Sequence, residues 1–242
     1  RDKLVTGVQT CALPISLREM GIDIKSTKAA FQGFGNVSQY AVKLYKEYGG
    51  TPICVSCWDQ EEQKSYTFKK KDGIDIDALL NITDRFGGID KKQAKTMGYE
   101  ILPGDAWIEQ EVDILIPAAL ENQVTGETAP KIHKNVKIMV EGANGPTTIE
   151  ADKVLKERGI FIVPDFLANA GGVMCSYFEQ VQCNMNYFWP KDEVLGKLDA
   201  KMTDAYLKVS ALARKKKIYM RDAAYMIAIQ RVAEACKMRG WV

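Results

Sequence analysis

The sequence predicts an α/β fold in which helices cover both faces of a doubly wound, mostly parallel sheet. From Ala29 onward, short apolar runs alternate with segments of helical periodicity. The runs are continuously apolar, as expected for strands that are buried on both faces. Strands and helices that alternate in this way build a parallel sheet. After about residue 170 only helical periodicity remains, so C-terminal helices are expected to pack on the sheet.

Five apolar runs are the expected strands, and the segments between them are the expected helices. The segment 148–158 has the clearest boundaries, because Thr147 or Thr148 can cap its first turn and Gly159 can end it. The expected strands are 29–34, 51–57, 112–119, 136–143 and 160–165, and the expected helices are 36–48, 75–85, 126–133 and 148–158.

Two apolar stripes at helical spacing follow in the C-terminal part of the chain. One lies in 194–213 and the other in 221–238, and we expect both to face a core by packing on the sheet or on a neighbouring lobe. The first stripe comprises Val194, Leu195, Leu198, Met202, Tyr206, Val209 and Leu212, and the second comprises Ala224, Ile227, Ala228, Val232, Ala235 and Cys236.

The composition is that of an ordinary soluble globular protein. Hydrophobic residues make up 46% of the 242 residues and charged residues 26%. The net charge of +2 is spread along the chain, so no nucleic-acid partner is expected. No apolar run approaches the length of a membrane span, and we expect a cytoplasmic protein without a membrane partner.

Cysteine and histidine usage argues against a metal centre. Cys54 and Cys57 form the only C-x-x-C pair among six cysteines. They lie in an expected strand, where side chains three positions apart point to opposite faces, so they are expected to be buried and reduced. His133 is the only histidine, which excludes chemistry that needs two, and we expect it at the surface.

The first sixteen residues, "RDKLVTGVQTCALPIS", differ from the rest of the chain. They lack the continuous apolar core of a signal peptide and resemble translated adapter sequence more than native protein. We therefore expect residues 1–16 to be non-native and exclude them from the predicted fold, with native-like sequence beginning near Leu17.

The stretch "GFGNVS" at 33–38 predicts a dinucleotide-binding turn of the Rossmann type. It follows an expected strand and opens an expected helix, which is the context that makes a G-x-G-x-x-G pattern informative. Gly33 allows the tight turn, and Gly35 lets the backbone approach a pyrophosphate on the helix N-terminus. Ser38 replaces the third glycine, which is needed only for close packing, and its side chain is small enough for the turn to bind NAD or NADP.

The end of the second strand leaves the choice between NAD and NADP open. An acidic residue there would hold the ribose 2′-hydroxyl, but Cys57 occupies the expected position. Asp59, two residues further on, is a candidate for the ribose, and Lys64 is a candidate for a 2′-phosphate.

Three amides follow the later strands, at the edge where parallel sheets bind ligands. Asn122, Asn144 and Asn169 each lie just past the end of an expected strand. Amides donate and accept hydrogen bonds, which suits a carboxamide and ribose hydroxyls. Beyond the last strand, "LANAGG" opens a further helix, and Ser176 offers a hydroxyl in its second turn.

Several motifs together resemble the cofactor-binding half of glutamate dehydrogenase, within the glutamate/leucine/phenylalanine/valine dehydrogenase superfamily. They are "FQGFGNV", "DILIPAALENQVT", "VEGANGPTT", "ADKVLKERGIFIVPDFLANAGGV", "SYFEQVQ" and "AAYMIAIQRVAEACKMRGW", and they run in order from about Leu17 to Val242. The resemblance implies oxidative deamination of L-glutamate to 2-oxoglutarate and ammonia, with hydride transfer to NAD or NADP, in a homo-hexamer.

The resemblance also assigns site residues and a domain division. It implies a dinucleotide-binding domain over 17–190, a helical segment over 191–242 that closes it, and an N-terminal substrate domain that is absent here. The catalytic lysine and aspartate of the family belong to that domain, so no catalytic residue is assigned, and we expect no turnover by this chain alone. The predicted cofactor-binding residues are Gly33, Phe34, Gly35, Asn36, Val37, Asp59, Ala118, Asn144 and Asn169, and the predicted substrate-binding residue is Ser176.

Two other interpretations remain open at this point. Another amino-acid dehydrogenase of the same superfamily would share the fold and the turn, although its C-terminal segments would resemble this sequence less. A stand-alone module that binds or senses a dinucleotide without catalysis would leave Ser176 without a role. The coding sequence upstream of Leu17 discriminates between an enzyme fragment and such a module.

Overall fold

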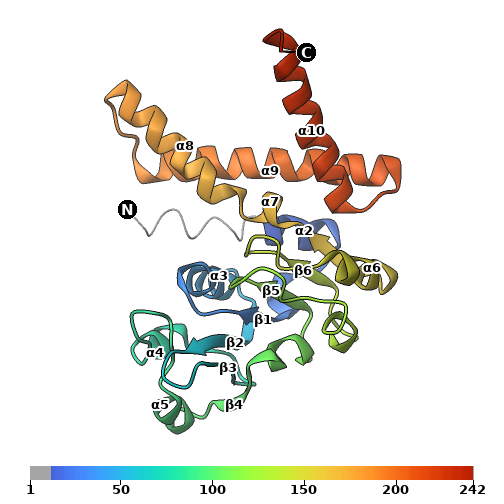
Figure 1. Ribbon diagram of the computed structural model, residues 1–242. Helices are drawn as coiled ribbons and strands as arrows, with labels where there is room; N and C mark the ends of the chain where they lie inside the picture. The colour runs from blue at the N-terminus through green and yellow to red at the C-terminus, as the bar shows by residue number, and fades with distance from the viewer. Residues whose placement is uncertain (1–11, 242) are drawn as a thin grey trace.

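The computed structural model describes residues 12–241 and shows a seven-stranded sheet with helices on both faces (Figure 1). The strand order is β4-β3-β2-β1-β5-β6-β7, and the five strands from β2 to β7 in this order pair in parallel. This arrangement confirms the predicted fold class. The strands are β1 (Lys28–Gln32), β2 (Thr51–Asp59), β3 (Lys64–Lys69), β4 (Glu100–Pro103), β5 (Ile114–Pro117), β6 (Ile138–Val140) and β7 (Phe161–Val163).

The direction in which successive strands are added to the sheet reverses between β1 and β5, although these two strands are parallel. From β1 the chain passes through α3 (Asn36–Glu47) to β2 on one side, and it later returns to β5 on the other side of β1. From β6 it continues outward through α6 (Ile149–Glu157) to β7. In sheets of this kind the carboxyl ends of the strands at the reversal form the ligand-binding crevice.

Two apolar cores lie on opposite faces of the sheet. The larger core contains Phe31 and Cys57, together with side chains from α3 and the C-terminal helices. The smaller core contains Ala30 and Cys54, together with side chains from α6. The two cysteines therefore point to opposite faces, as expected. Burial raises the pKa of the Cys57 thiol to about 11, which keeps it protonated at neutral pH.

The antiparallel edge of the sheet was not expected from the sequence. Strands β3 and β4 pair antiparallel with β2 and with each other, in a region without a continuous apolar run. The expected helix 75–85 is only α4 (Ile76–Leu80), and the expected helix 126–133 is only the 3₁₀ turn η4 (Ala129–Lys131). The remaining short elements are η2 (Ile24–Ser26), α5 (Lys91–Thr96) and η3 (Gly104–Glu109).

The fold begins earlier than the sequence indicates. Helix α2 spans Ala12–Glu19, and Ala12, Leu13 and Ser16 are buried in it. Residues 12–16, which the predicted fold excludes, are therefore part of the folded domain, because Ala12 and Leu13 join the larger core. Residues 1–11 lie outside the described residues, and the foreign origin of 1–16 stays a prediction.

Most of the first apolar stripe is buried against the domain, whereas the second packs on it only near its start, and packing of the rest on a neighbouring lobe stays a prediction. Leu198, Met202 and Tyr206 on α9 are buried, as predicted. On α10 burial ends after Ala224, and Val232 is 64% exposed. Figure 1 shows the reason, because α10 leaves the body of the domain and its outer turns meet no other element. The helices are α7 (Asp165–Ala168), α8 (Ala170–Met185), α9 (Lys191–Lys216) and α10 (Met220–Met238).

None of the helices within residues 12–241 combines the length and the apolar character that a membrane crossing requires.

A buried charge network fastens the start of α10 to the sheet. Arg221 donates hydrogen bonds to both carboxylate oxygens of Glu141, at 2.7 and 2.9 Å, and to Asp152 on α6 at 2.6 and 3.1 Å. Glu141 is fully buried, and it also accepts hydrogen bonds from the Thr147 hydroxyl and the Asp165 N–H. The network thus joins the ends of β6 and β7 to the first turn of α10.

Candidate functional site

The glycine turn lies between the end of β1 and the start of α3. Gly33 has a φ of +92°, and a Cβ atom there would lie 2.8 Å from the Cβ of Ala119, which follows β5. The Gly33 N–H donates a hydrogen bond to the Ser56 Oγ on β2 at 3.0 Å. Only glycine permits both this backbone conformation and this close approach, so Gly33 brings the ends of β1, β2 and β5 together.

The N-terminus of α3 is open to a ligand. Gly35 is its N-cap residue and supplies no side-chain hydrogen bond to the first-turn N–H groups. A Cβ atom at Gly35 would meet nothing within 4 Å. Unpaired N–H groups and the helix dipole favour an anion at this position. The turn therefore leaves room for the pyrophosphate of a dinucleotide, and its binding there stays a prediction.

A cavity of about 620 Å³ opens in front of the turn. Its volume is within the range of roughly 300–1,000 Å³ that small-molecule sites occupy. It brings together Gly33, Phe34, Gly35, Asn36, Val37 and Ala118 from the predicted cofactor residues. The other lining residues are Cys57, Trp58, Gln60, Phe86, Gly87, Ala119 and Leu120.

Asp59 does not line this cavity, although Trp58 and Gln60 on either side of it do. Its Oδ1 accepts hydrogen bonds from the N–H groups of Glu61 and Glu62, both at 2.9 Å, and its Oδ2 forms an ion pair with Lys91 at 2.8 Å. The hydrogen bond from Lys91 and that from the Glu62 N–H lower the pKa of Asp59. Both carboxylate oxygens of Asp59 therefore already have partners within the chain.

Lys64, the candidate for a 2′-phosphate, lies on β3. It lines a separate cavity between β3 and β4, which Trp58 also borders. It is not among the residues that line the cavity at the glycine turn.

The three predicted amides lie in neighbouring loops at the carboxyl edge of the sheet. Asn169 donates a hydrogen bond from its Nδ2 to the Oδ1 of Asn144 at 2.7 Å. The Asn122 N–H donates to the Gly145 carbonyl at 2.9 Å, and the Gly145 N–H donates to Asp165 at 2.8 Å. The loops after β5, β6 and β7 are thus joined, but these amides do not line the cavity at the turn.

Ser176 lies in the second turn of α8 and is exposed. Its hydroxyl donates a hydrogen bond to the Gly172 carbonyl of the same helix at 3.3 Å. It does not line the cavity at the turn, so its role toward a substrate stays a prediction.

The loop between α4 and α5 is a part of the site that the sequence analysis missed. A Cβ atom at Gly87 would lie 2.9 Å from the Phe34 carbonyl oxygen, so this loop packs directly against the glycine turn. Asp84 shapes the loop by accepting hydrogen bonds from the N–H groups of Phe86 and Gly88. Phe86 is exposed and lines the cavity. The paired glycines of "RFGG" signal this turn, but the helix expected over 75–85 obscured it.

Ser38 occupies the position of the third glycine and is fully buried. Among the described residues its Oγ has no hydrogen-bond partner. We expect Ser38→Ala to raise the free energy of unfolding by about 1 kcal/mol, because it removes an unpaired buried hydroxyl. Urea denaturation measures the change. Ser210→Ala is the matched control and should destabilise, because the Ser210 hydroxyl donates to Glu19 at 2.7 Å. A loss of stability in Ser38→Ala would contradict the prediction.

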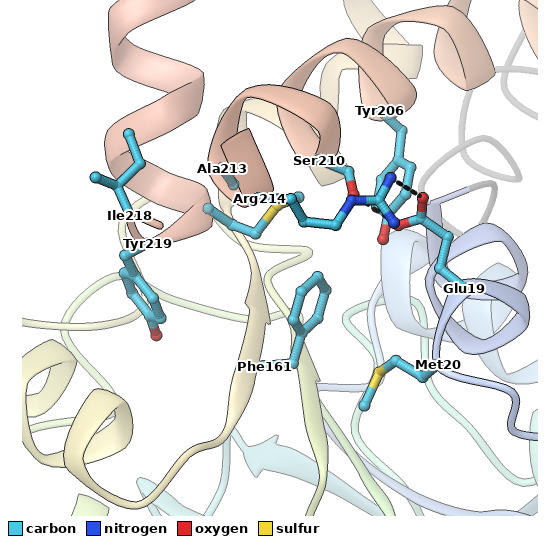
Figure 2. Close-up of a pocket in the computed structure, with 10 residues that line it drawn as sticks. Glu19, Met20, Phe161, Tyr206, Ser210, Ala213, Arg214, Ile218 and Tyr219 are labelled. Carbon is cyan, nitrogen blue, oxygen red and sulfur yellow. Dashed lines mark hydrogen bonds and ion pairs between the residues drawn. The ribbon is translucent and has the colours of Figure 1, made fainter. Parts of the chain in front are cut away.

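A second cavity, of about 300 Å³, lies between the end of α2, the start of β7 and the C-terminal part of α9 (Figure 2). Phe161, the first residue of β7, forms part of its wall. Glu19 at the end of α2 binds Ser210 and Arg214 on α9 across it. This cavity shares no lining residue with the cavity at the glycine turn, and its polar residues tie α2 to α9.

Comparison with known proteins places the chain in a family. A family model described as Glutamate/Leucine/Phenylalanine/Valine dehydrogenase matches residues 6–240. The chain is 42% identical over 224 residues to the NAD-specific glutamate dehydrogenase of Clostridioides difficile, covering 92% of this chain and 51% of that protein. It is 40% identical over 241 residues to the cryptic catabolic NAD-specific glutamate dehydrogenase GudB of Bacillus subtilis (strain 168), covering 98% and 52%.

A solved structure agrees with these relatives. The crystal structure of the glutamate dehydrogenase from Peptoniphilus asaccharolyticus matches with a TM-score of 0.79 and 37% identity, over 100% of this chain and 55% of that one. The chain spans about half the length of the curated relatives it matches. The match extends along almost the whole described chain and includes the glycine turn, the sheet and the C-terminal helices, so the chain belongs to the Glutamate/Leucine/Phenylalanine/Valine dehydrogenase family.

Proposed function

We propose that this chain is the cofactor-binding half of an NAD- or NADP-dependent glutamate dehydrogenase. The whole enzyme would convert L-glutamate to 2-oxoglutarate and ammonia. The observation that carries the proposal is the open N-terminus of α3 beside a cavity of about 620 Å³, in a chain whose relatives are named as NAD-specific glutamate dehydrogenases.

The chain's own residues would bind and orient the dinucleotide. The first-turn N–H groups of α3 would hold the pyrophosphate, because Gly35 leaves them uncovered. Ala118 at the end of β5 would form the wall beside the nicotinamide, and the linked pair Asn144 and Asn169 would offer amide groups at the same edge. When bound, the nicotinamide supplies the hydride acceptor for the reaction.

Substrate would be held jointly with the part of the relatives that this chain does not span. Ser176 on the exposed side of α8 is the proposed contact of this chain to the glutamate side-chain carboxylate. A hydride transfer needs the substrate held at reacting distance over the nicotinamide. None of the residues assigned to this site is a general acid or base, so the catalytic lysine and aspartate are assigned to the remaining part of the enzyme, and the homo-hexamer remains an inference from the resemblance.

We expect the purified chain to bind NADH without catalysing glutamate oxidation. Titration followed by NADH fluorescence should show saturable binding, and an assay with glutamate and NAD should show no NADH formation. Turnover by the chain alone would contradict the assignment of the catalytic residues to the remaining part of the enzyme. Absence of NADH binding by the folded chain would overturn the proposed function. Sequencing the coding DNA upstream of Leu17 separates an enzyme fragment from a stand-alone dinucleotide-binding module.

A further inference from the structure

A cluster of one lysine and two carboxylates lies at the end of β2, beside the cofactor cavity. Lys91, the first residue of α5, forms an ion pair with Asp59 at 2.8 Å and a second ion pair with Glu62. The Tyr66 hydroxyl donates a hydrogen bond to Glu62, and the Lys91 ammonium lies 4.2 Å from the centre of the Tyr66 ring. The lysine is thus held from three directions by the β2–β3 hairpin.

The cluster lies at the end of the second strand, which is where folds of this type bind the ribose of the cofactor. In dinucleotide-binding sheets of this type, a carboxylate near the end of the second strand binds the ribose 2′-hydroxyl and disfavours a 2′-phosphate. Here Trp58 and Gln60 line the cavity at the turn, whereas Asp59 between them lines a neighbouring cavity together with Lys91. The carboxylate is turned away from the dinucleotide site and toward α5.

The charges of the cluster have a second consequence. Lys91 offsets part of the negative charge of this region. The neighbouring cavity is lined by the carboxylates of Asp59, Glu61, Glu62, Asp84 and Asp90 and by the ammonium groups of Lys91 and Lys92. The pair is partly sheltered, since the side chain of Asp59 is 18% exposed and that of Lys91 is 25% exposed. Charges in such a position act on a bound phosphate through a partly screened field.

We propose that Lys91 is a positioning residue for cofactor choice: it withdraws Asp59 from the ribose and reduces the negative charge there, so that this chain binds NADPH about as well as NADH. The proposal rests on the proposed function, because it concerns the same dinucleotide site. It sets this chain apart from relatives that are named as NAD-specific.

The test compares the dissociation constants of NADH and NADPH for the 242-residue chain and three variants, by the fluorescence of the reduced nicotinamide. In the unaltered chain we expect the two constants to lie within about fivefold of each other. Lys91→Gln exposes the full negative charge of Asp59 and Glu62, and should raise the NADPH constant about threefold or more relative to that of NADH. Added salt should diminish this difference.

Two further variants separate positioning from a structural role. Asp59→Asn in the Lys91→Gln background should restore the NADPH constant, because it removes one of the two exposed charges and returns the cluster to its original net charge. Lys95→Gln, on the exposed face of the same helix, is the matched control and should leave the ratio of the two constants unchanged. A thermal melt of each variant verifies that the domain is folded, and a purely structural effect would weaken both cofactors equally.

The outcomes distinguish failure of the role of Lys91 from failure of the proposed function. Binding of NADH with NADPH more than about a hundredfold weaker, or a Lys91→Gln variant with an unchanged ratio, would overturn the role of Lys91 while leaving the proposed function intact. Binding of neither cofactor would overturn both. A ratio close to one that shifts toward NADH in Lys91→Gln and returns in the double variant would support the proposal.

Discussion

Replacing Arg221 with methionine should lower the free energy of unfolding by about 3–5 kcal/mol. The side chain of Arg221 is 15% exposed, and its partner Glu141 is fully buried. Methionine fills part of the space but leaves the Glu141 carboxylate without its guanidinium. A buried carboxylate that loses its counter-charge is strongly destabilising, whereas most surface substitutions change stability little. Urea denaturation followed by circular dichroism measures the difference.

A matched control tests whether burial is the cause. Arg214→Met removes an arginine from α9 whose side chain is 65% exposed and which pairs with Glu19 at 2.9 Å. An exposed pair of this kind contributes less than about 1 kcal/mol. If both substitutions cost the same, the buried network does not have the role that its geometry indicates.

The same network supports the candidate site. The Glu141 carboxylate accepts a hydrogen bond from the Asp165 N–H. The Asp165 carboxylate in turn accepts a hydrogen bond from the Gly145 N–H, beside Asn144. Arg221→Met should therefore also loosen the loop that carries Asn144, in addition to lowering overall stability. Hydrogen exchange at Gly145 should accelerate more than at the N–H groups of β1.

Gly35→Val should weaken NADH binding by about a hundredfold or more while the domain remains folded. A Cβ atom at this position meets nothing within 4 Å, so the added bulk enters the space in front of α3. There it competes with the pyrophosphate, whose charge-assisted hydrogen bonds to the helix N-terminus contribute about 1.5–3 kcal/mol each. Fluorescence titration with NADH measures the loss.

Gly196→Val is the control for Gly35→Val. Gly196 lies within α9, and a Cβ atom there also meets nothing within 4 Å. This variant should bind NADH as the unaltered chain does. Undiminished binding by Gly35→Val would show that the pyrophosphate lies elsewhere, and the proposed cofactor site would have to be abandoned.

The sequence predicts the parallel part of the sheet well because its strands carry the signal within themselves. Residues 112–119 and 136–143 are apolar on both faces, and the observed strands β5 and β6 lie within these ranges. The antiparallel strand β3 has no such signal, because it is not a continuous apolar run and its first two residues are exposed. Its strand conformation comes from pairing with β2, which is a contact between segments that the sequence pattern does not reveal.

The site shows the same division. The glycine turn is predicted from six consecutive residues, because its function depends on local backbone conformation at Gly33 and Gly35. The position of Asp59 depends instead on Lys91, which lies more than thirty residues later in the chain. The contribution of Phe86 likewise depends on how the loop after α4 packs against the turn.

The sequence by itself determined the parallel strands of the sheet, the glycine turn and the buried stripe of α9. These features follow from backbone conformation and from apolar periodicity, both of which are properties of a short segment. Only the tertiary structure decided that Asp59 faces Lys91, that Arg221 neutralises Glu141, and that the outer turns of α10 stay exposed within the described chain. Each of these depends on which distant groups come within contact distance, and local sequence does not encode that distance.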